Sequence, residues 1–151
     1  MENFIKEFDS DYRKIIGEYE IEMARGFIPV SFHGSQVKDE FAMAWYHLMQ
    51  RIKDIENDTI TFLEIGAYKG LWALMLSHIC DKLKVDYEYT TITALSQDPN
   101  NDLTGVINYY YSKNKIFKVI DKQSQDPSVV NDLDKKYDFV FIDGGHSYDE
   151  L

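Results

Sequence analysis

The chain has 151 residues, the length of a single domain and enough to bury a core. Its composition is ordinary for a globular protein, and its formal net charge of −10 without a basic stripe disfavours nucleic acid as a partner. No stretch approaches the roughly 18 apolar residues that a membrane helix requires, no secretory leader opens the sequence, and the single cysteine excludes an internal disulfide, so we expect a cytoplasmic protein with no membrane partner.

Two amphipathic helices are expected in the N-terminal third of the chain. Apolar residues recur at three- and four-residue steps over residues 1–24, and again over residues 36–55. Gly26 and Pro29 separate the two helical stretches. We therefore predict an N-terminal helical segment, residues 1–57, that packs on a core formed by residues 58–151, the whole being one structural domain.

Strands and helices alternate through the rest of the chain. The predicted strands are 59–64, 87–95, 116–120 and 137–142, and the predicted helices are 71–82, 102–113 and 125–133. This alternation predicts an α/β fold with a mostly parallel sheet and helices on both faces. In such sheets ligands bind beyond the carboxyl ends of the strands. Cys80 lies in an apolar helical run, where we expect a small buried side chain.

The turn after the first strand has the composition of a ligand-binding turn. It reads Glu64-Ile65-Gly66-Ala67-Tyr68-Lys69-Gly70. A nicotinamide-binding turn would have glycine where Tyr68 stands, and its acid would come about twenty residues later rather than before the turn. Gly66 and Gly70 allow the backbone to approach a ligand closely. The alternative is a tight strand-to-helix turn that binds nothing.

A second strand-end turn carries two residues with chemical potential. Asp143 and His146 follow the last predicted strand, separated by two glycines. The carboxylate could bind a divalent cation, and the imidazole could take a proton from a hydroxyl group. The alternative for Asp143 is to cap the next helix.

Together the two turns resemble one subgroup of the class I S-adenosylmethionine-dependent methyltransferases. This subgroup is methyltransferase family 24, which includes macrocin-type sugar O-methyltransferases and cephalosporin-hydroxylase-type proteins, and the resemblance covers residues 59–151. It implies a Rossmann-like three-layer sandwich with strand order 3-2-1-4, preceded here by two N-terminal helices. The full class I sheet has further strands, so we expect a C-terminally truncated chain.

The resemblance also implies the role of each site residue. S-adenosylmethionine would be bound by Glu64, Gly66, Ala67, Tyr68, Gly70, Ser96, Asp98, Ser124 and Asp143. Asp143 would also hold a magnesium ion, and His146 would be the general base. The family usually places an acid at the end of the second strand for the ribose hydroxyls. Here Ser96 occupies that place and Asp98 follows two residues later, so either could meet the ribose.

The resulting functional expectation is methyl transfer from S-adenosylmethionine to a hydroxyl of a small-molecule acceptor. One alternative is a truncated, binding-only fragment or pseudoenzyme, and a less favoured one is a dinucleotide-dependent oxidoreductase. The last strand, residues 137–142, would be an apolar edge strand. Exposed edges of this kind promote association, so we expect a homodimer or another covering element.

Overall fold

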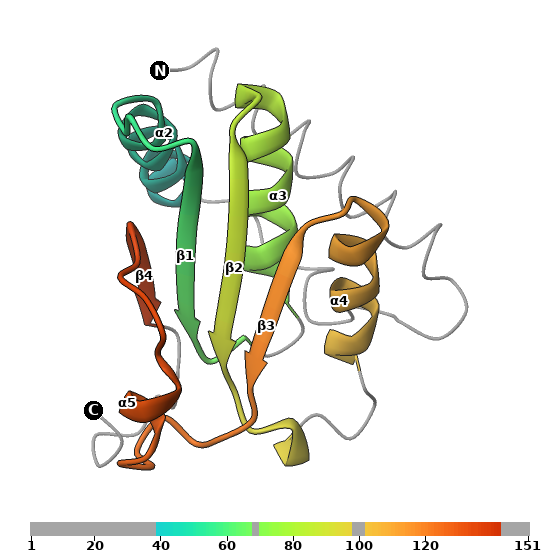
Figure 1. Cartoon of the computed structure of the whole chain (residues 1–151). Coiled ribbons are helices and arrows are strands. Elements are labelled where there is room, and N and C mark those ends of the chain that lie inside the picture. Colours follow the sequence, from blue (N-terminus) through green and yellow to red (C-terminus); the bar gives the residue numbers. More distant parts are fainter. Residues whose placement is uncertain (1–38, 68–69, 98–101, 143–151) are drawn as a thin grey trace. The chain divides into compact units, whose positions relative to one another are not determined.

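The computed structural model describes residues 39–67, 70–97 and 102–142 (Figure 1). The chain divides into two units, Met1–Glu56 and Asn57–Leu151. In the first unit, helix α2 (Asp39–Lys53) lies within the predicted second helix. The predicted helix over residues 1–24 lies outside the described residues.

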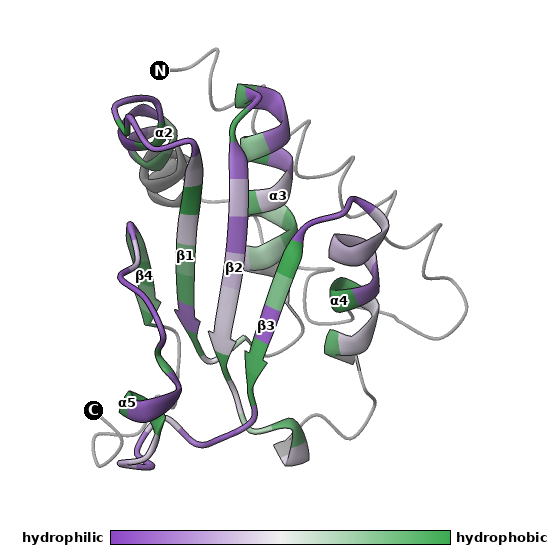
Figure 2. Ribbon diagram, in the orientation of Figure 1, coloured by the Kyte–Doolittle hydropathy of each residue, from purple (hydrophilic) through white to green (hydrophobic). Residues whose placement is uncertain are grey.

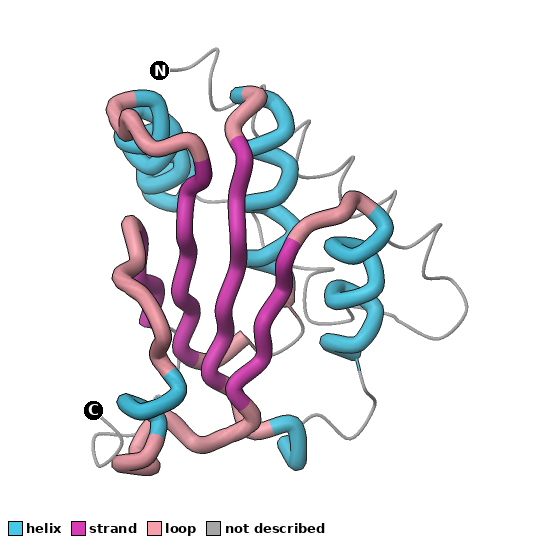
Figure 3. The backbone as a smooth tube through the Cα atoms, in the orientation of Figure 1, coloured by secondary structure: helices cyan, strands magenta, loops and turns pink. Residues whose placement is uncertain are grey.

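The second unit is built on a four-stranded parallel sheet (Figure 3). Its strands are β1 (Thr59–Ile65), β2 (Asp86–Ile92), β3 (Ile116–Ile120) and β4 (Phe139–Ile142), in the order β3-β2-β1-β4. All three strand pairs are parallel, and Phe62 of β1 aligns with Tyr89 on one side and Phe139 on the other. The α/β class and the 3-2-1-4 order predicted from the sequence are confirmed.

Helices cover both faces of this sheet. On one face, α3 (Leu71–Leu83) contacts β2, α4 (Asp102–Ser112) contacts β3, and the two helices contact each other (Figure 1). On the other face, Val129 of the short helix α5 (Val129–Asp132) packs against Leu63, Ile92 and Ile120. Figure 2 shows hydrophobic residues along much of β1, β3 and β4, a more polar β2, and hydrophilic residues in many of the connecting loops.

Two predicted boundaries were wrong. The second strand was predicted to reach residue 95 but ends at Ile92, and the 3-10 helix η2 (Leu95–Gln97) follows. The predicted helix 125–133 is reduced to Val129–Asp132. Before it, the Asp126 carboxylate accepts hydrogen bonds from the Ser128 amide at 2.8 Å and hydroxyl at 2.6 Å. Such local bonds compete with helical ones.

Strand β4 is the edge of the described sheet, as expected. Phe139 stacks on Phe62 with ring centroids 5.4 Å apart, and Phe141 packs on Trp72 at 5.5 Å. On the opposite face of the strand, Ile142 is 72% exposed. Association through this edge stays a prediction.

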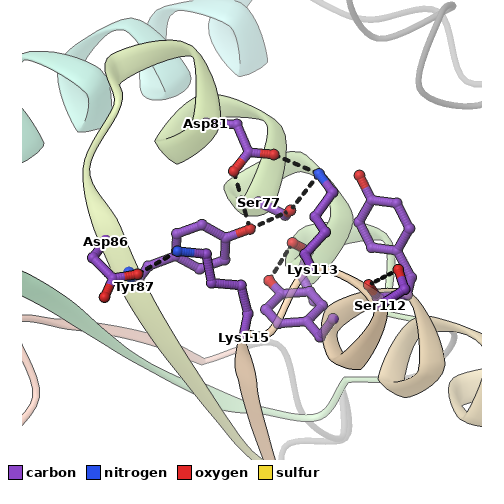
Figure 4. Close-up of polar contacts among 10 residues, drawn as sticks. Ser77, Asp81, Asp86, Tyr87, Ser112, Lys113 and Lys115 are labelled. Carbon is purple, nitrogen blue, oxygen red and sulfur yellow. Dashed lines mark hydrogen bonds and ion pairs between the residues drawn. The ribbon is translucent and has the colours of Figure 1, made fainter.

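Polar contacts join neighbouring elements at the end of the sheet where the strands begin (Figure 4). The Tyr87 hydroxyl shares a 2.6 Å hydrogen bond with Ser77 Oγ and donates to Asp81 Oδ1 at 3.3 Å, while Lys113 forms an ion pair with Asp81. These contacts join the end of α3, the start of β2 and the end of α4. The polar groups of this cluster bind one another, and the predicted site residues lie toward the opposite ends of the strands.

Cys80 is a buried free thiol on α3. Burial raises the pKa of this thiol to about 12, so it is protonated at neutral pH. The prediction of a small buried side chain is confirmed. No helix in the described ranges is long and apolar enough to cross a membrane.

Candidate functional site

The turn from β1 to α3 depends on its two glycines. Gly66 has a φ of 90° and Gly70 a φ of 78°, both in the left-handed region that side chains disfavour. The Gly66 amide donates to Ile92 O at 2.9 Å, and the Gly70 amide donates to Ala67 O at 2.7 Å. Ala67 is buried, and Tyr68 lies outside the described residues. Gly66 is therefore tied to the end of β2 and Gly70 to Ala67, and α3 begins at the residue after Gly70.

Gly70 is also the point where α4 approaches this turn. A Cβ atom at Gly70 would lie 2.8 Å from Val106 Cγ2 and 3.0 Å from Leu103 Cδ1. Both distances are shorter than ordinary contacts, so the absence of a side chain lets α4 pack against the start of α3. The glycine was predicted for close approach to a ligand; its contact with α4 is a second, structural requirement.

Glu64 is a fully buried carboxylate near the end of β1. It is 0% exposed, and its Oε2 accepts a 2.6 Å hydrogen bond from the hydroxyl of Tyr89, which is also 0% exposed. The Thr91 hydroxyl donates to the Glu64 carbonyl at 3.3 Å. Sequence reasoning selected Glu64 but missed Tyr89, because a tyrosine within a strand rich in Tyr and Thr matches no motif. A ligand must move part of the surrounding structure to reach this carboxylate.

The loops after β2 and β3 leave the same edge of the sheet, because Ile92 and Ile120 are aligned in parallel strands. Ser96 lies on η2 and is exposed, and Ser124 is exposed in the loop after β3. Asp121 connects the two loops, since its Oδ1 accepts a 2.8 Å hydrogen bond from the Leu95 amide. Asp121 was not selected from the sequence, although its place directly after a strand was the available signal.

The remaining predicted site residues follow η2 or β4. Ile142 aligns with Ile65, so the chain leaves β4 at the same edge as the β1 turn. Asp98, Asp143 and His146 lie outside the described residues. Within the described ranges, no group of three or more His, Cys, Asp or Glu residues could hold a metal ion. A magnesium site at Asp143 stays a prediction.

The fold, together with the turns at the carboxyl ends of its strands, defines the class of protein. The strand order reverses between β1 and β4, and the glycine turn, η2 and the loop after β3 all lie at the carboxyl ends of the strands. This is the arrangement of Rossmann-like α/β domains, in which ligands bind at the point where the strand order reverses.

Comparison with known proteins gives the family. The family model described as a methyltransferase domain, methyltransferase family 24, matches residues 63–151, which is more than half of the chain. The chain belongs to this methyltransferase family, as its two strand-end turns indicated. No curated protein matches the sequence.

The fold is similar to that of a solved methyltransferase structure. That structure is the methyltransferase PaMTH1 of Podospora anserina bound to S-adenosylhomocysteine, with a TM-score of 0.53 and 18% sequence identity. The alignment covers 94% of this chain and 58% of that methyltransferase, so this chain spans somewhat more than half of its length. At this identity the likeness supports the fold.

Proposed function

We propose that this chain binds S-adenosylmethionine at the carboxyl edge of its sheet and contributes the cofactor half of an enzyme that methylates a hydroxyl group of a small molecule. The observation that carries the proposal is the β1 turn. A buried carboxylate, Glu64, comes two residues before Gly66 and six before Gly70, both glycines have a positive φ, and the chain belongs to a methyltransferase family. The product-bound state of the structurally similar PaMTH1 supports the same cofactor.

Each part of the cofactor has a candidate partner. Glu64 is assigned the amino group, the backbone of Gly66, Ala67, Tyr68 and Gly70 the methionine portion, Ser96 or Asp98 the ribose, and Ser124 the adenine. Asp143 is assigned the side of the site next to β4. A magnesium ion at Asp143 would help to orient the acceptor and would need further ligands from beyond the described residues.

His146 is the proposed general base. When bound, S-adenosylmethionine would supply the methyl group on its sulfonium and would leave as S-adenosylhomocysteine with the electron pair of the carbon–sulfur bond. The imidazole of His146 would accept the proton of the acceptor hydroxyl as its oxygen bonds to the methyl carbon. An imidazole suits this task because its ordinary pKa lies near neutral pH.

Isothermal titration calorimetry of the chain with S-adenosylmethionine, S-adenosylhomocysteine and NAD tests the cofactor. We expect the two sulfur ligands to bind at one site and NAD to give no heat, because Glu64 precedes the turn and Tyr68 replaces the central glycine of a dinucleotide motif. Binding of NAD alone would support an oxidoreductase instead. Binding of S-adenosylmethionine without turnover of any hydroxylated acceptor would support a binding-only protein.

A further inference from the structure

Tyr89 lies directly against the carboxylate of the candidate cofactor turn. We propose that Tyr89 is a positioning residue: its hydroxyl holds the Glu64 carboxylate in the orientation that receives the ammonium group of the cofactor. This inference rests on the proposed function. Tyr89 belongs to β2 and lies 25 positions from Glu64 in the sequence, whereas the rest of the site is assigned to turns at the ends of strands.

The hydrogen bond between the two side chains is short and fully enclosed. The Tyr89 hydroxyl donates to Glu64 Oε2 at 2.6 Å, and both residues are 0% exposed. Hydrogen bonds to an ionised carboxylate are shorter and stronger than those between neutral groups. Because a carboxylate is planar, a bond that fixes Oε2 also restricts the position of Oε1.

The Tyr89 ring is itself held in place by three elements. It stacks on Phe117 of β3 with centroids 5.1 Å apart, and it lies 5.8 Å from the ring of Tyr110 on α4 and 6.3 Å from Phe62 on β1. A ring packed on several sides has one accessible orientation in the core. The donor that meets Glu64 is therefore prearranged before any ligand arrives.

The Tyr89 hydroxyl stays protonated beside Glu64. Tyrosine is a neutral donor, so its hydrogen bond orients the carboxylate without neutralising it. Burial, followed by the negative charge of Glu64, holds the pKa of Tyr89 well above its usual value, so the hydroxyl keeps its proton. The nearby Tyr110 hydroxyl points elsewhere and donates to Ala73 O at 2.6 Å. A carboxylate held in one orientation binds a cationic amino group more strongly than it binds a neutral group.

Tyr89→Phe is the direct test, because it removes the hydroxyl and keeps the ring. Calorimetry would compare S-adenosylhomocysteine with 5′-methylthioadenosine, which has the adenosine and sulfur but no amino-acid portion. We expect Tyr89→Phe to weaken S-adenosylhomocysteine binding by about tenfold and to leave methylthioadenosine binding unchanged. Tyr110→Phe is the matched control, since it also removes a buried hydroxyl that donates at 2.6 Å, and it should change neither affinity.

The same substitution in a Glu64→Gln chain separates positioning of the carboxylate by Tyr89 from a general effect on the structure. In a Glu64→Gln chain, the charge that Tyr89 orients is gone, so adding Tyr89→Phe should cause little further loss of S-adenosylhomocysteine binding. Equal weakening of both ligands, no change with either, or an undiminished effect of Tyr89→Phe in the Glu64→Gln chain would overturn the inference while leaving the proposed function standing. Failure of the unmodified chain to bind S-adenosylhomocysteine would overturn both.

Discussion

Replacing Gly70 with alanine should lower the free energy of unfolding by about 2 to 5 kcal/mol. Two costs add up in this figure. The φ of 78° disfavours any side chain, and the new Cβ would meet Val106 Cγ2 at 2.8 Å. Val106 is fully buried and β-branched, so it cannot rotate away easily. Urea unfolding followed by circular dichroism measures the change.

A double-mutant cycle with Val106→Ala isolates the part of this cost that comes from the contact with Val106. Val106→Ala removes the atom that the new Cβ would strike, so the double variant should be more stable than the sum of the two single losses predicts. The strain from the positive φ should remain. Strict additivity, or a Gly70→Ala loss too small to measure, would show that the turn and α4 are not packed as described.

His146→Ala should lower the rate of methyl transfer by about 10²- to 10⁴-fold and leave S-adenosylhomocysteine affinity unchanged. The reason is that the imidazole is proposed to accept the proton of the acceptor hydroxyl and is not assigned to the cofactor. Turnover would be followed as S-adenosylhomocysteine released, using an acceptor selected from a panel of hydroxylated small molecules and the longest form of the chain that the gene encodes.

His47→Ala is the control for this variant, because His47 is an exposed histidine on α2 with no assigned role. It should change neither turnover nor affinity. Turnover that survives His146→Ala would remove His146 from the mechanism, and a joint loss of turnover and cofactor binding would make its role structural.

Much of the fold could be predicted because it follows from local patterns. Alternating strands and helices gave the parallel sheet, and all four strands lie within or close to their predicted ranges. The boundaries that were wrong lie next to hydrogen bonds made by single carboxylates. Asp121 binds the Leu95 amide where η2 begins, and Asp126 binds Ser128 where a longer helix was expected. The periodic pattern of hydrophobic residues gives no information about such hydrogen bonds.

The candidate site could be predicted from the sequence only where its residues lie close together in one short motif. Glu64, Gly66 and Gly70 form one short motif, and the structure adds the left-handed backbone and the contact with α4. The partner of Glu64 could not be read from the sequence, because Tyr89 reaches it from the neighbouring strand. Pairings between distant positions depend on strand register, which is known only once the sheet is assembled.

The most direct test of the central claim is a ¹H–¹⁵N NMR titration of the chain with S-adenosylhomocysteine. We predict that amide shifts will concentrate at the carboxyl edge of the sheet, at Gly66, Gly70 and Ser96. The polar cluster at the other edge, which includes Ser77, Tyr87 and Lys113, should stay unchanged. Shifts confined to that cluster, or no shifts at saturating ligand, would contradict the proposal that the β1 turn is a cofactor site.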